Sequence, residues 1–251
     1  MPAWGQVLWV ILPYIALTVF VVGNLYRLRI DPYGWTTRSS ELLEKRWLRW
    51  GSLLFHWGIL GVFLGHIAGL LVPRTVYDAL GVSDEVYHLL SLSLGSAAGI
   101  AAASGGIILL VRRATVPRVR RTSQAGDFAS LILVLLVIGT GLWAKAWHLF
   151  APTAFEYRDT IGPWVRGLLT FRPDPRLMTG VPLPYQIHAL AGLVLLAAWP
   201  FTRLVHAFSL PLGYLWRTYV LYRRHPRRHP LGDEQAATTG TRIELAGGHG
   251  R

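Results

Sequence analysis

Four histidines lie inside two apolar stretches of the sequence, two in each stretch. His56 and His66 lie in "LFHWGILGVFLGH" (54–66), and His188 and His206 lie in a second apolar stretch nearer the C-terminus. A polar side chain inside a bilayer is costly and usually marks a functional site. A hydrogen bond between helices explains a single such histidine equally well, but four of them in two stretches favour a shared chemical role.

The directions of the two stretches predict how the histidines pair. If each apolar stretch crosses the bilayer in turn, the second and the fifth run in opposite directions. His56 then lies at the depth of His206, and His66 lies at the depth of His188. Two facing pairs of imidazoles are what two six-coordinate haem irons require, so we expect these four histidines to be the ligands of an inner and an outer iron. At 1.5 Å per residue the pairs are about 15 Å apart on one helix and about 27 Å apart on the other, so level pairing needs helix tilt or a kink at Pro200.

Five charge-free runs predict that the chain is an integral membrane protein. The sequence has 251 residues, of which 52% are hydrophobic and only 15% are charged. Each run approaches or exceeds the roughly 20 apolar residues that a membrane-spanning helix needs. We expect an all-α bundle of five transmembrane helices, at about 4–26, 51–72, 87–111, 127–148 and 184–210. The bundle forms one domain, 1–222, and the polar, glycine-rich segment 223–251 is expected to be a disordered cytoplasmic tail.

The positions of the basic residues predict the orientation of the helices. The net charge is +12, but Lys and Arg gather between the apolar runs, and "RRATVPRVRR" (112–121) has five basic residues and no acid. Short basic loops stay in the cytoplasm, so we expect the N-terminus outside and the C-terminus inside, in the inner (plasma) membrane. Because the charges do not lie on one face of a folded domain, we expect membrane lipid and no nucleic acid as a partner.

Two further features exclude whole classes of protein. No basic residue precedes Arg27, and the first apolar run is longer than the core of a signal peptide, so we expect a retained helix. The sequence has no cysteine, which excludes structural disulfides, cysteine-ligated iron–sulfur clusters and covalent c-type haem attachment.

Small and basic residues near the histidines are candidates for accommodating a haem. Glycines repeat on one helical face beside His66 and leave a groove that either a porphyrin or a neighbouring helix could fill. They are Gly58, Gly61, Gly65 and Gly69. Arg203, one turn before His206, and Arg112, at the inner end of the third helix, could pair with haem propionates. The bias of cytoplasmic loops toward basic residues explains Arg112 and Arg113 equally well.

Several longer motifs, spread over residues 8–225, resemble one known family. The chain is similar to the gamma subunit of membrane-bound respiratory nitrate reductase, the cytochrome b membrane anchor. The matching motifs are "LPYI" (12–15), "RSSELL" (38–43), "LFHWGILGVFLGH" (54–66), "GPWVR" (162–166), "FRPD" (171–174) and "WPFTRLVHAFSLPLGYL" (199–215).

The resemblance implies a cofactor set and partners. Members of that family hold two haem b groups, with ligands that match His56 and His206 on the cytoplasmic side and His66 and His188 on the outer side. Their quinol site lies near the outer haem, around the position of Gly65 and His66. An iron–sulfur beta subunit and a molybdenum alpha subunit bind on the cytoplasmic side.

One stretch departs from the enterobacterial members of the family. They place a lysine associated with quinol binding at the start of the third helix, where this chain has "EVYHLL" (85–90), with Tyr87 and His88. This stretch is similar to that of the Gram-positive members, which use menaquinol. His88 could still form a hydrogen bond to a quinol oxygen and accept its proton, because an unperturbed imidazole titrates near neutrality.

These observations predict a quinol-oxidising subunit that passes electrons across the membrane to a nitrate reductase, whose nitrate-reducing site is on another chain. A close alternative is the same type of anchor serving another cytoplasmic reductase, either sulfite-reductase-associated or heterodisulfide-reductase-like. A transporter with a histidine proton relay and a purely structural anchor are two further alternatives, and both predict a colourless protein.

Overall fold

The fold is built from helices throughout the part of the chain that the structure describes. The computed structural model describes residues 3–31, 43–150 and 155–208, and these residues contain no strand. They belong to the first of the two units into which the chain divides, 1–210 and 211–251. Five helical segments are long and apolar enough to cross a membrane, which confirms the predicted all-α membrane bundle. The predicted tail, 223–251, lies outside the described residues.

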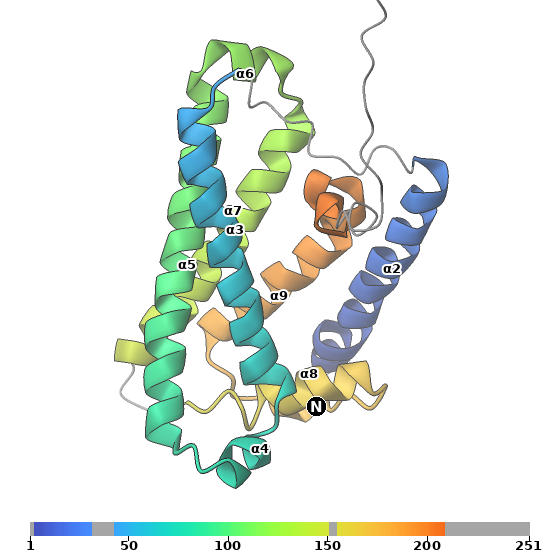
Figure 1. Ribbon diagram of the computed structural model, residues 1–251. Helices are drawn as coiled ribbons and strands as arrows, with labels where there is room; N and C mark the ends of the chain where they lie inside the picture. Colours follow the sequence, from blue (N-terminus) through green and yellow to red (C-terminus); the bar gives the residue numbers. More distant parts are fainter. Residues whose placement is uncertain (1–2, 32–42, 151–154, 209–251) are drawn as a thin grey trace, which may run out of the picture. The chain divides into compact units, whose positions relative to one another are not determined.

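The five spans and the short helices between them follow one another in the order shown in Figure 1. The spans are α1 (Ala3–Gln6), η1 (Val7–Ile11) and α2 (Leu12–Ile30); α3 (Arg46–His66) and η2 (Ile67–Leu71); α5 (Asp84–Thr115); α7 (Ala125–Phe150); and α9 (Leu183–Ala198), η4 (Trp199–Phe201) and η5 (Arg203–Phe208). The short helices are α4 (Arg74–Ala79), α6 (Pro117–Thr122), α8 (Ile161–Leu169) and η3 (Pro175–Met178). We refer below to the α4 end and the α6 end of the bundle.

The third span is longer than the sequence predicted, and its N-terminal end is stabilised locally. The expected helix covered about 87–111, whereas α5 runs from Asp84 to Thr115. Ser83 caps its N-terminus by accepting a hydrogen bond from the backbone N–H of Val86, and two acidic residues occupy the first turn. Both features offset the unpaired N–H groups and the positive end of the helix dipole.

Glycines allow α3 and α5 to pack with their backbones in contact. A Cβ atom added at Gly58 would lie 2.4 Å from the backbone nitrogen of Ala102, and one added at Gly105 would lie 2.3 Å from that of Phe55. Small residues at membrane helix interfaces permit this close approach. The two helices therefore form one closely packed pair, visible side by side in Figure 1.

The last span breaks where the sequence predicted only a kink. The α-helix ends at Ala198, and the chain continues through 3₁₀ turns with an extended residue, Thr202, between them. Proline lacks an N–H and its ring crowds the preceding turn, so Pro200 interrupts the hydrogen-bond ladder. Arg27 of α2 compensates by donating to the carbonyl oxygens of Pro200 and Thr202, both at 2.7 Å. The break turns the chain before His206.

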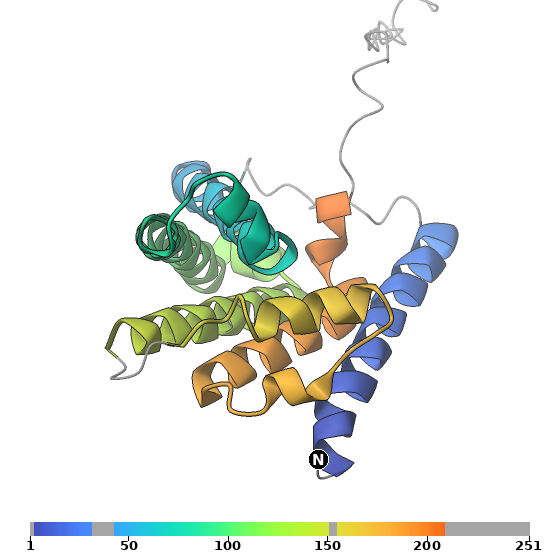
Figure 2. The same ribbon diagram turned by 90° about the horizontal axis from the view of Figure 1, so that it is seen from below.

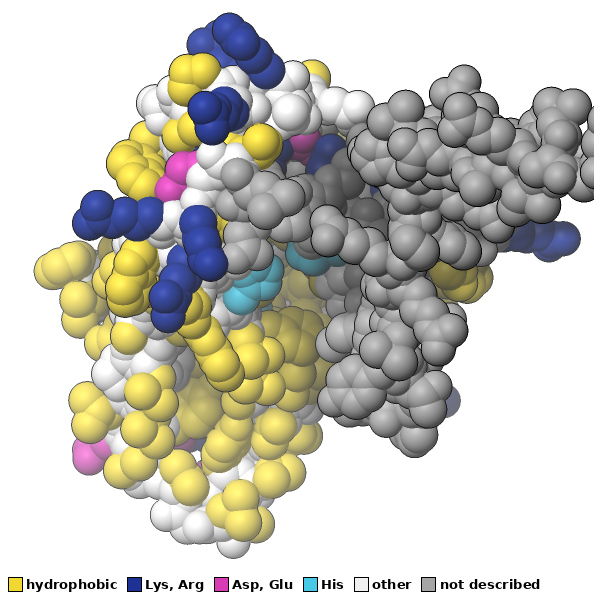
Figure 3. Space-filling model, turned by 45° about the horizontal axis from the view of Figure 1, so that its top comes forward, with side chains coloured by type: hydrophobic (Ala, Val, Ile, Leu, Met, Phe, Trp, Pro, Cys, Tyr) yellow, Lys and Arg dark blue, Asp and Glu magenta, His cyan; other side chains and the backbone are white. Residues whose placement is uncertain are grey.

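The surface of the bundle is divided by polarity. Many large apolar side chains of the spans are exposed, and Figure 3 shows apolar side chains over the lower part of the coloured surface, whereas Lys and Arg gather toward the α6 end. At the opposite end, α8 and η3 lie across the bundle beside the start of α9 (Figure 2). Trp164 of α8 is anchored there by donating from its indole N–H to the carbonyl oxygen of Trp9, at 2.9 Å.

Candidate functional site

The structure brings the four intramembrane histidines together as two pairs. The ring centres of His56 and His206 are 6.3 Å apart, with an interplanar angle of 71°. Those of His66 and His188 are 5.8 Å apart, with an angle of 43°. Each pair takes one ring from α3 and one from the last span. The unequal spacing along the two helices is accommodated because His206 lies on η5, beyond the break at Pro200.

A backbone hydrogen bond fixes which nitrogen of three of these rings carries hydrogen. The Nδ1 atom of His56 lies 2.7 Å from the carbonyl oxygen of Ser52, and that of His66 lies 2.7 Å from the carbonyl oxygen of Val62. The Nδ1 atom of His206 contacts the carbonyl oxygen of Arg203 in the same way. A carbonyl only accepts, so Nδ1 must donate, and the lone pair of each neutral ring is on Nε2.

The Nδ1 atom of His188 also donates a hydrogen bond, in this case to a side chain of α7. The hydroxyl of Thr140 donates to the carbonyl oxygen of Val137 at 2.8 Å, so its oxygen accepts from the Nδ1 atom of His188 at 3.1 Å. A glycine makes room for the ring, because a Cβ atom on Gly141 would lie 2.9 Å from the His188 Cε1 atom. All four neutral imidazoles therefore carry their lone pair on Nε2.

The separations within the pairs suit a metal between the rings. An imidazole nitrogen binds a first-row metal at about 2 Å and lies about 1 Å in front of its ring centre, so two opposed ligands have ring centres about 6 Å apart. The observed 5.8 and 6.3 Å agree with that distance. Hydrogen bonding of the second ring nitrogen is the usual way in which proteins orient such ligands. Each pair would offer two protein ligands, as a haem requires.

The two arginines predicted to bind propionates are engaged with carboxylates of the chain. Arg112, with its side chain 3% exposed, donates from Nε to Glu44 at 2.7 Å. Burial raises the pKa of Glu44, but hydrogen bonds from the Trp47 N–H and from Arg112 outweigh it and lower that pKa overall. Arg203 contacts the buried Asp127, which also binds Arg113 at 2.8 Å. Both arginines thus hold α-helical ends together near the His56–His206 pair, and their contact with propionates stays a prediction.

The four glycines of α3 and η2 serve different purposes. Gly58 and Gly61 face α5, where a Cβ atom at Gly61 would lie 3.0 Å from that of Ala98. Gly69 faces the hydroxyl of Tyr87, which would be 3.1 Å from an added Cβ. Gly65 is exposed, and nothing lies within 4 Å of the position of its Cβ. Helix packing therefore explains Gly58 and Gly61, and open space lies only beside Gly65.

Tyr87 and His88, the predicted quinol residues of α5, point in different directions. Tyr87 is buried, and its hydroxyl lies 3.0 Å from that of Tyr157, which in turn lies 3.1 Å from Ser91 Oγ. His88 is partly exposed, and its Nε2 lies 2.8 Å from a carboxylate oxygen of Glu156. His88 is therefore hydrogen-bonded to a carboxylate, whereas Tyr87 is held inside a group of hydroxyls.

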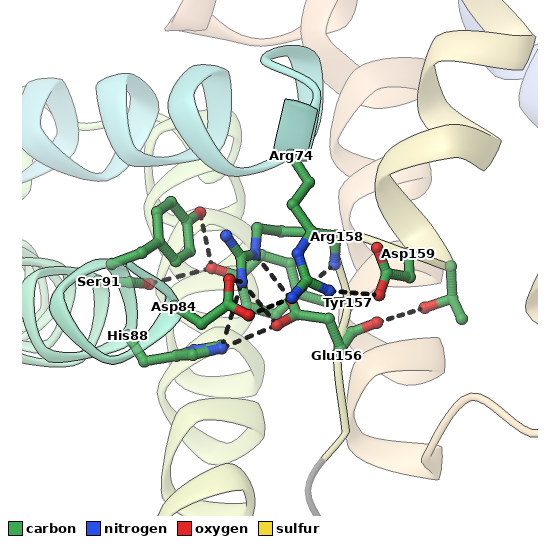
Figure 4. Close-up of polar contacts among 10 residues, drawn as sticks. Arg74, Asp84, His88, Ser91, Glu156, Tyr157, Arg158 and Asp159 are labelled. Atoms are coloured by element: carbon green, nitrogen blue, oxygen red, sulfur yellow. Dashed lines mark hydrogen bonds and ion pairs between the residues drawn. The ribbon is translucent and has the colours of Figure 1, made fainter. Parts of the chain in front are cut away.

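An ion-pair network surrounds His88 at the α4 end (Figure 4), and we call it the polar cluster. It consists of Arg74, Asp84, His88, Glu156, Arg158 and Asp159. Arg158, with its side chain 1% exposed, donates to Asp84 and Glu156, each at 2.8 Å. Burial raises the pKa of Glu156, but the hydrogen bonds from Arg158 outweigh it and lower that pKa to about 2. The hydrogen bond to Glu156 raises the pKa of Arg158 despite burial, so both groups stay charged.

Sequence reasoning missed Lys145, Glu156 and Arg158. Lys145 falls within the expected fourth helix, 127–148, and α7 continues to Phe150, so the ammonium lies inside the span. A charged residue at such a position was the available signal. Glu156 and Arg158 lie between the fourth and fifth expected helices, and nothing in their local pattern indicates the long-range partners.

Comparisons with known proteins agree with the family indicated by the motifs. The family model described as nitrate reductase gamma subunit matches residues 5–225. The nitrate reductase gamma chain of Bacillus subtilis (strain 168) is 49% identical over 220 residues, which cover 88% of this chain and 98% of that protein. The respiratory nitrate reductase 1 gamma chain of Escherichia coli (strain K12) is 35% identical over 217 residues, 86% of this chain and 96% of that protein. A more distant relative, 25% identical over 261 aligned positions that cover 81% of this chain and 76% of that protein, is the Hdr-like menaquinol oxidoreductase cytochrome b-like subunit of Archaeoglobus fulgidus.

Proposed function

This chain belongs to the nitrate reductase gamma subunit family, and from that premise we propose that it is the quinol-oxidising dihaem cytochrome b subunit of a respiratory nitrate reductase. It would take electrons from quinol, with menaquinol favoured, at the α4 end and deliver them at the α6 end. There an iron–sulfur subunit would receive them for a molybdenum subunit that reduces nitrate. The matches to gamma chains along nearly their whole lengths support this assignment.

The single observation that carries the proposal is the geometry of the two histidine pairs. Each pair has the separation of two opposed iron ligands, and each ring donates from Nδ1 to an oxygen of the chain. His56 with His206, and His66 with His188, would hold the inner and the outer haem b. Bound there, the haems would supply one-electron carriers at two depths of the bundle. Arg112 and Arg203 are the residues from which propionate contacts would come.

The α4 end provides the groups that a quinol needs on losing two protons. Quinol would bind beside the exposed Gly65 and His66, with Tyr87 and His88 on the facing helix. His88 would accept a proton at Nδ1, because its Nε2–H donates to the Glu156 carboxylate, which Arg158 keeps ionised and which would stabilise the resulting imidazolium. Because the polar cluster is partly exposed, a proton held there can pass to water on the outer side.

The α6 end provides the docking surface for the next subunit. Its exposed basic residues include Arg46, Arg49, Arg118, Arg120 and Arg121. Because the sequence has no cysteine, a cysteine-ligated iron–sulfur cluster would have to lie on a partner chain. A basic surface attracts an acidic partner and raises its rate of association. The same bias supports a cytoplasmic position for this end and an outer position for the N-terminus.

The proposal is tested by counting b-type haems in the purified chain and in two variants. The unaltered chain should carry two haems, and His56→Ala and His66→Ala should each remove one, from different ends of the bundle. His148→Ala is the matched control, because His148 also lies in a span but belongs to neither pair. A chain purified without chromophore from haem-replete cells, or equal haem content in all four proteins, would overturn the ligand assignment.

The relative in Archaeoglobus keeps a second function open, in which the same anchor serves a heterodisulfide-reductase-like or another cytoplasmic reductase. That protein's name includes a menaquinol oxidoreductase of Hdr-like type. Co-purification from the native membrane separates the two functions. A molybdenum-containing subunit with nitrate reductase activity supports the first, and an iron–sulfur protein without molybdenum supports the second.

A further inference from the structure

Lys145 is an ammonium inside a membrane span with no carboxylate beside it. It lies in α7, five residues before the helix ends, and its side chain is only partly exposed. Its Nζ atom donates to the carbonyl oxygen of Ser91 on α5, at 2.6 Å. Among the residues that the structure describes, no carboxylate lies within 4 Å of it. Such a charge is costly in a bilayer and marks a functional site.

The direction of the Lys145 side chain argues against simple anchoring at the interface. A lysine near a helix end usually extends its ammonium to the headgroups and leaves its stem in the apolar region. Here the side chain instead crosses to the neighbouring helix, where Gly95 leaves room for it. A Cβ atom on Gly95 would lie 2.7 Å from the Lys145 Nζ atom. The chain therefore holds this charge inside the bundle, between α5 and α7.

Lys145 lies close to the His66–His188 pair. Residues four apart on a helix lie on the same face, one turn from each other, so Lys145 is one turn from Gly141. The His188 ring is in contact with Gly141, where an added Cβ would be 2.9 Å from its Cε1 atom. The backbone of Lys145 is thus about one helical turn, roughly 6 Å along α7 at 1.5 Å per residue, from the helix position against which this ring packs.

A row of hydroxyls connects Lys145 to the open side of the pair. Ser91, whose carbonyl accepts from Lys145, contacts Tyr157 through its hydroxyl, and Tyr157 contacts Tyr87. The Tyr87 hydroxyl faces Gly69, which is one turn beyond Gly65 on the same span. Contacts therefore run from the ammonium through Ser91, Tyr157 and Tyr87 to Gly69, one turn along the chain from the open position at Gly65.

An ammonium has three N–H donors, and the Ser91 carbonyl uses one of them. The group that suits the others must be an oxygen acceptor, and it must be apolar enough to enter from the bilayer. We propose that Lys145 binds an oxygen of the quinol through a charge-assisted hydrogen bond and so positions the quinol beside the His66–His188 pair. This inference rests on the proposed function. A nearby positive charge also favours the ionised form of an acidic hydroxyl, so it eases loss of the quinol proton.

Binding of a quinol analogue to the haem-loaded chain tests the inference. The probe is a hydroxyquinoline N-oxide, whose affinity is measured by quenching of its fluorescence. Lys145→Met should weaken binding roughly ten- to hundredfold, the loss expected for one charge-assisted hydrogen bond. Lys145→Gln, which keeps a donor but no charge, should fall between Lys145→Met and the unaltered chain. Arg172→Gln, an exposed cation removed near the same end of the bundle, is the matched control and should leave the affinity unchanged.

The outcomes separate this inference from the proposed function. Unchanged affinity in Lys145→Met, while the unaltered chain binds the probe, overturns the role of Lys145 alone. A shift in the potential of one haem with no change in affinity also overturns it, because the ammonium would then pair with a propionate. No binding by the unaltered chain overturns both proposals. If Lys145→Met does not accumulate, Lys145→Arg decides the question, because it keeps the charge. Its affinity for the probe should lie within about threefold of that of the unaltered chain. The affinity of Lys145→Gln should fall below that range.

Discussion

At the scale of single residues, the hydrogen bonds of the histidines determine what the site can do. Each Nδ1 atom donates to an oxygen of the chain, and for three of the rings that oxygen belongs to the backbone three or four residues earlier in the sequence. The rings are therefore positioned by their own helices. The exception is His188, which depends on Thr140 of another helix. The His66–His188 pair consequently needs α7 and α9 to stay packed.

His206 depends on an ion pair, because it follows the break in the last span. Its Nδ1 atom donates to the carbonyl of Arg203, and the Arg203 side chain is held by Asp127. We expect Asp127→Asn to loosen this turn and to weaken haem retention at the His56–His206 site by about tenfold, the effect of losing an outer hydrogen-bond partner.

Redox titration of the bound haems checks that expectation. Asp127→Asn should change the midpoint potential or the occupancy of the proposed inner haem and should leave those of the outer haem unchanged. Asp78→Asn, at an exposed position, is the control and should leave both haems unchanged. Equal changes at the two haems would show that Asp127 only supports the fold.

Glu156 predicts how stability depends on pH. Its pKa falls from an ordinary 4.5 to about 2 in the folded protein, with the hydrogen bonds from Arg158 outweighing burial. A carboxyl with a lowered folded pKa stabilises the fold above its unfolded pKa and loses that contribution as the pH falls toward the folded value. Thermal unfolding in detergent should therefore show a contribution that is constant above about pH 5 and declines between about pH 4.5 and pH 2.

The variant Glu156→Gln should flatten that acid-side decline and lower the unfolding temperature at pH 7. Asp174→Asn, on an exposed turn, is the control and should keep the decline. If Glu156→Gln unfolds with the same pH profile as the unaltered protein, the ion pair with Arg158 is not what stabilises the α4 end.

At the scale of helices, the contact between α3 and α5 is the most constrained part of the fold. Gly58→Ala places a methyl group 2.4 Å from the Ala102 nitrogen, so the helices must separate. Overpacking of this kind costs about 1–3 kcal/mol. We expect a lower unfolding temperature and a lower yield for Gly58→Ala. Gly65→Ala, on the same helix but with open space at its Cβ, should unfold like the unaltered protein, and equal losses in both would contradict this account.

The helices also show where sequence reasoning succeeds and where it stops. Charge-free runs located all five spans, because length and hydropathy are local properties, and the depth argument placed the right histidines opposite one another. The predicted end of the fifth helix was wrong. The sequence shows Pro200, but it does not show that Arg27 can donate hydrogen bonds to the carbonyl oxygens that a complete break leaves without partners. The long-range partners of Glu156 and Arg158 could not be predicted from local pattern. Lys145 could have been singled out from the sequence, because it is a charged residue within the expected fourth helix.

At the scale of the whole molecule, charge and hydropathy together are the basis of the proposed orientation. Apolar side chains cover the spans, and basic residues gather at the α6 end, as Figure 3 shows. The absence of cysteine from the sequence makes any introduced thiol unique. We expect Arg172→Cys, beyond α8, to react with a membrane-impermeant maleimide in intact cells. Arg120→Cys, in α6, should react only after the membrane is opened, and the reverse pattern would invert the proposed orientation.

The central claim is that quinol bound at the α4 end reduces two haems held by His56 with His206 and His66 with His188. The most direct measurement is an anaerobic reduced-minus-oxidised spectrum of the purified chain in vesicles, with a menaquinol analogue as the only reductant. The account predicts the absorption of two b-type haems per chain, both reduced by the quinol, whereas His66→Ala should keep one haem that a chemical reductant reduces and the quinol does not. A colourless unaltered chain, or haems in the unaltered chain that only a chemical reductant can reduce, would contradict it.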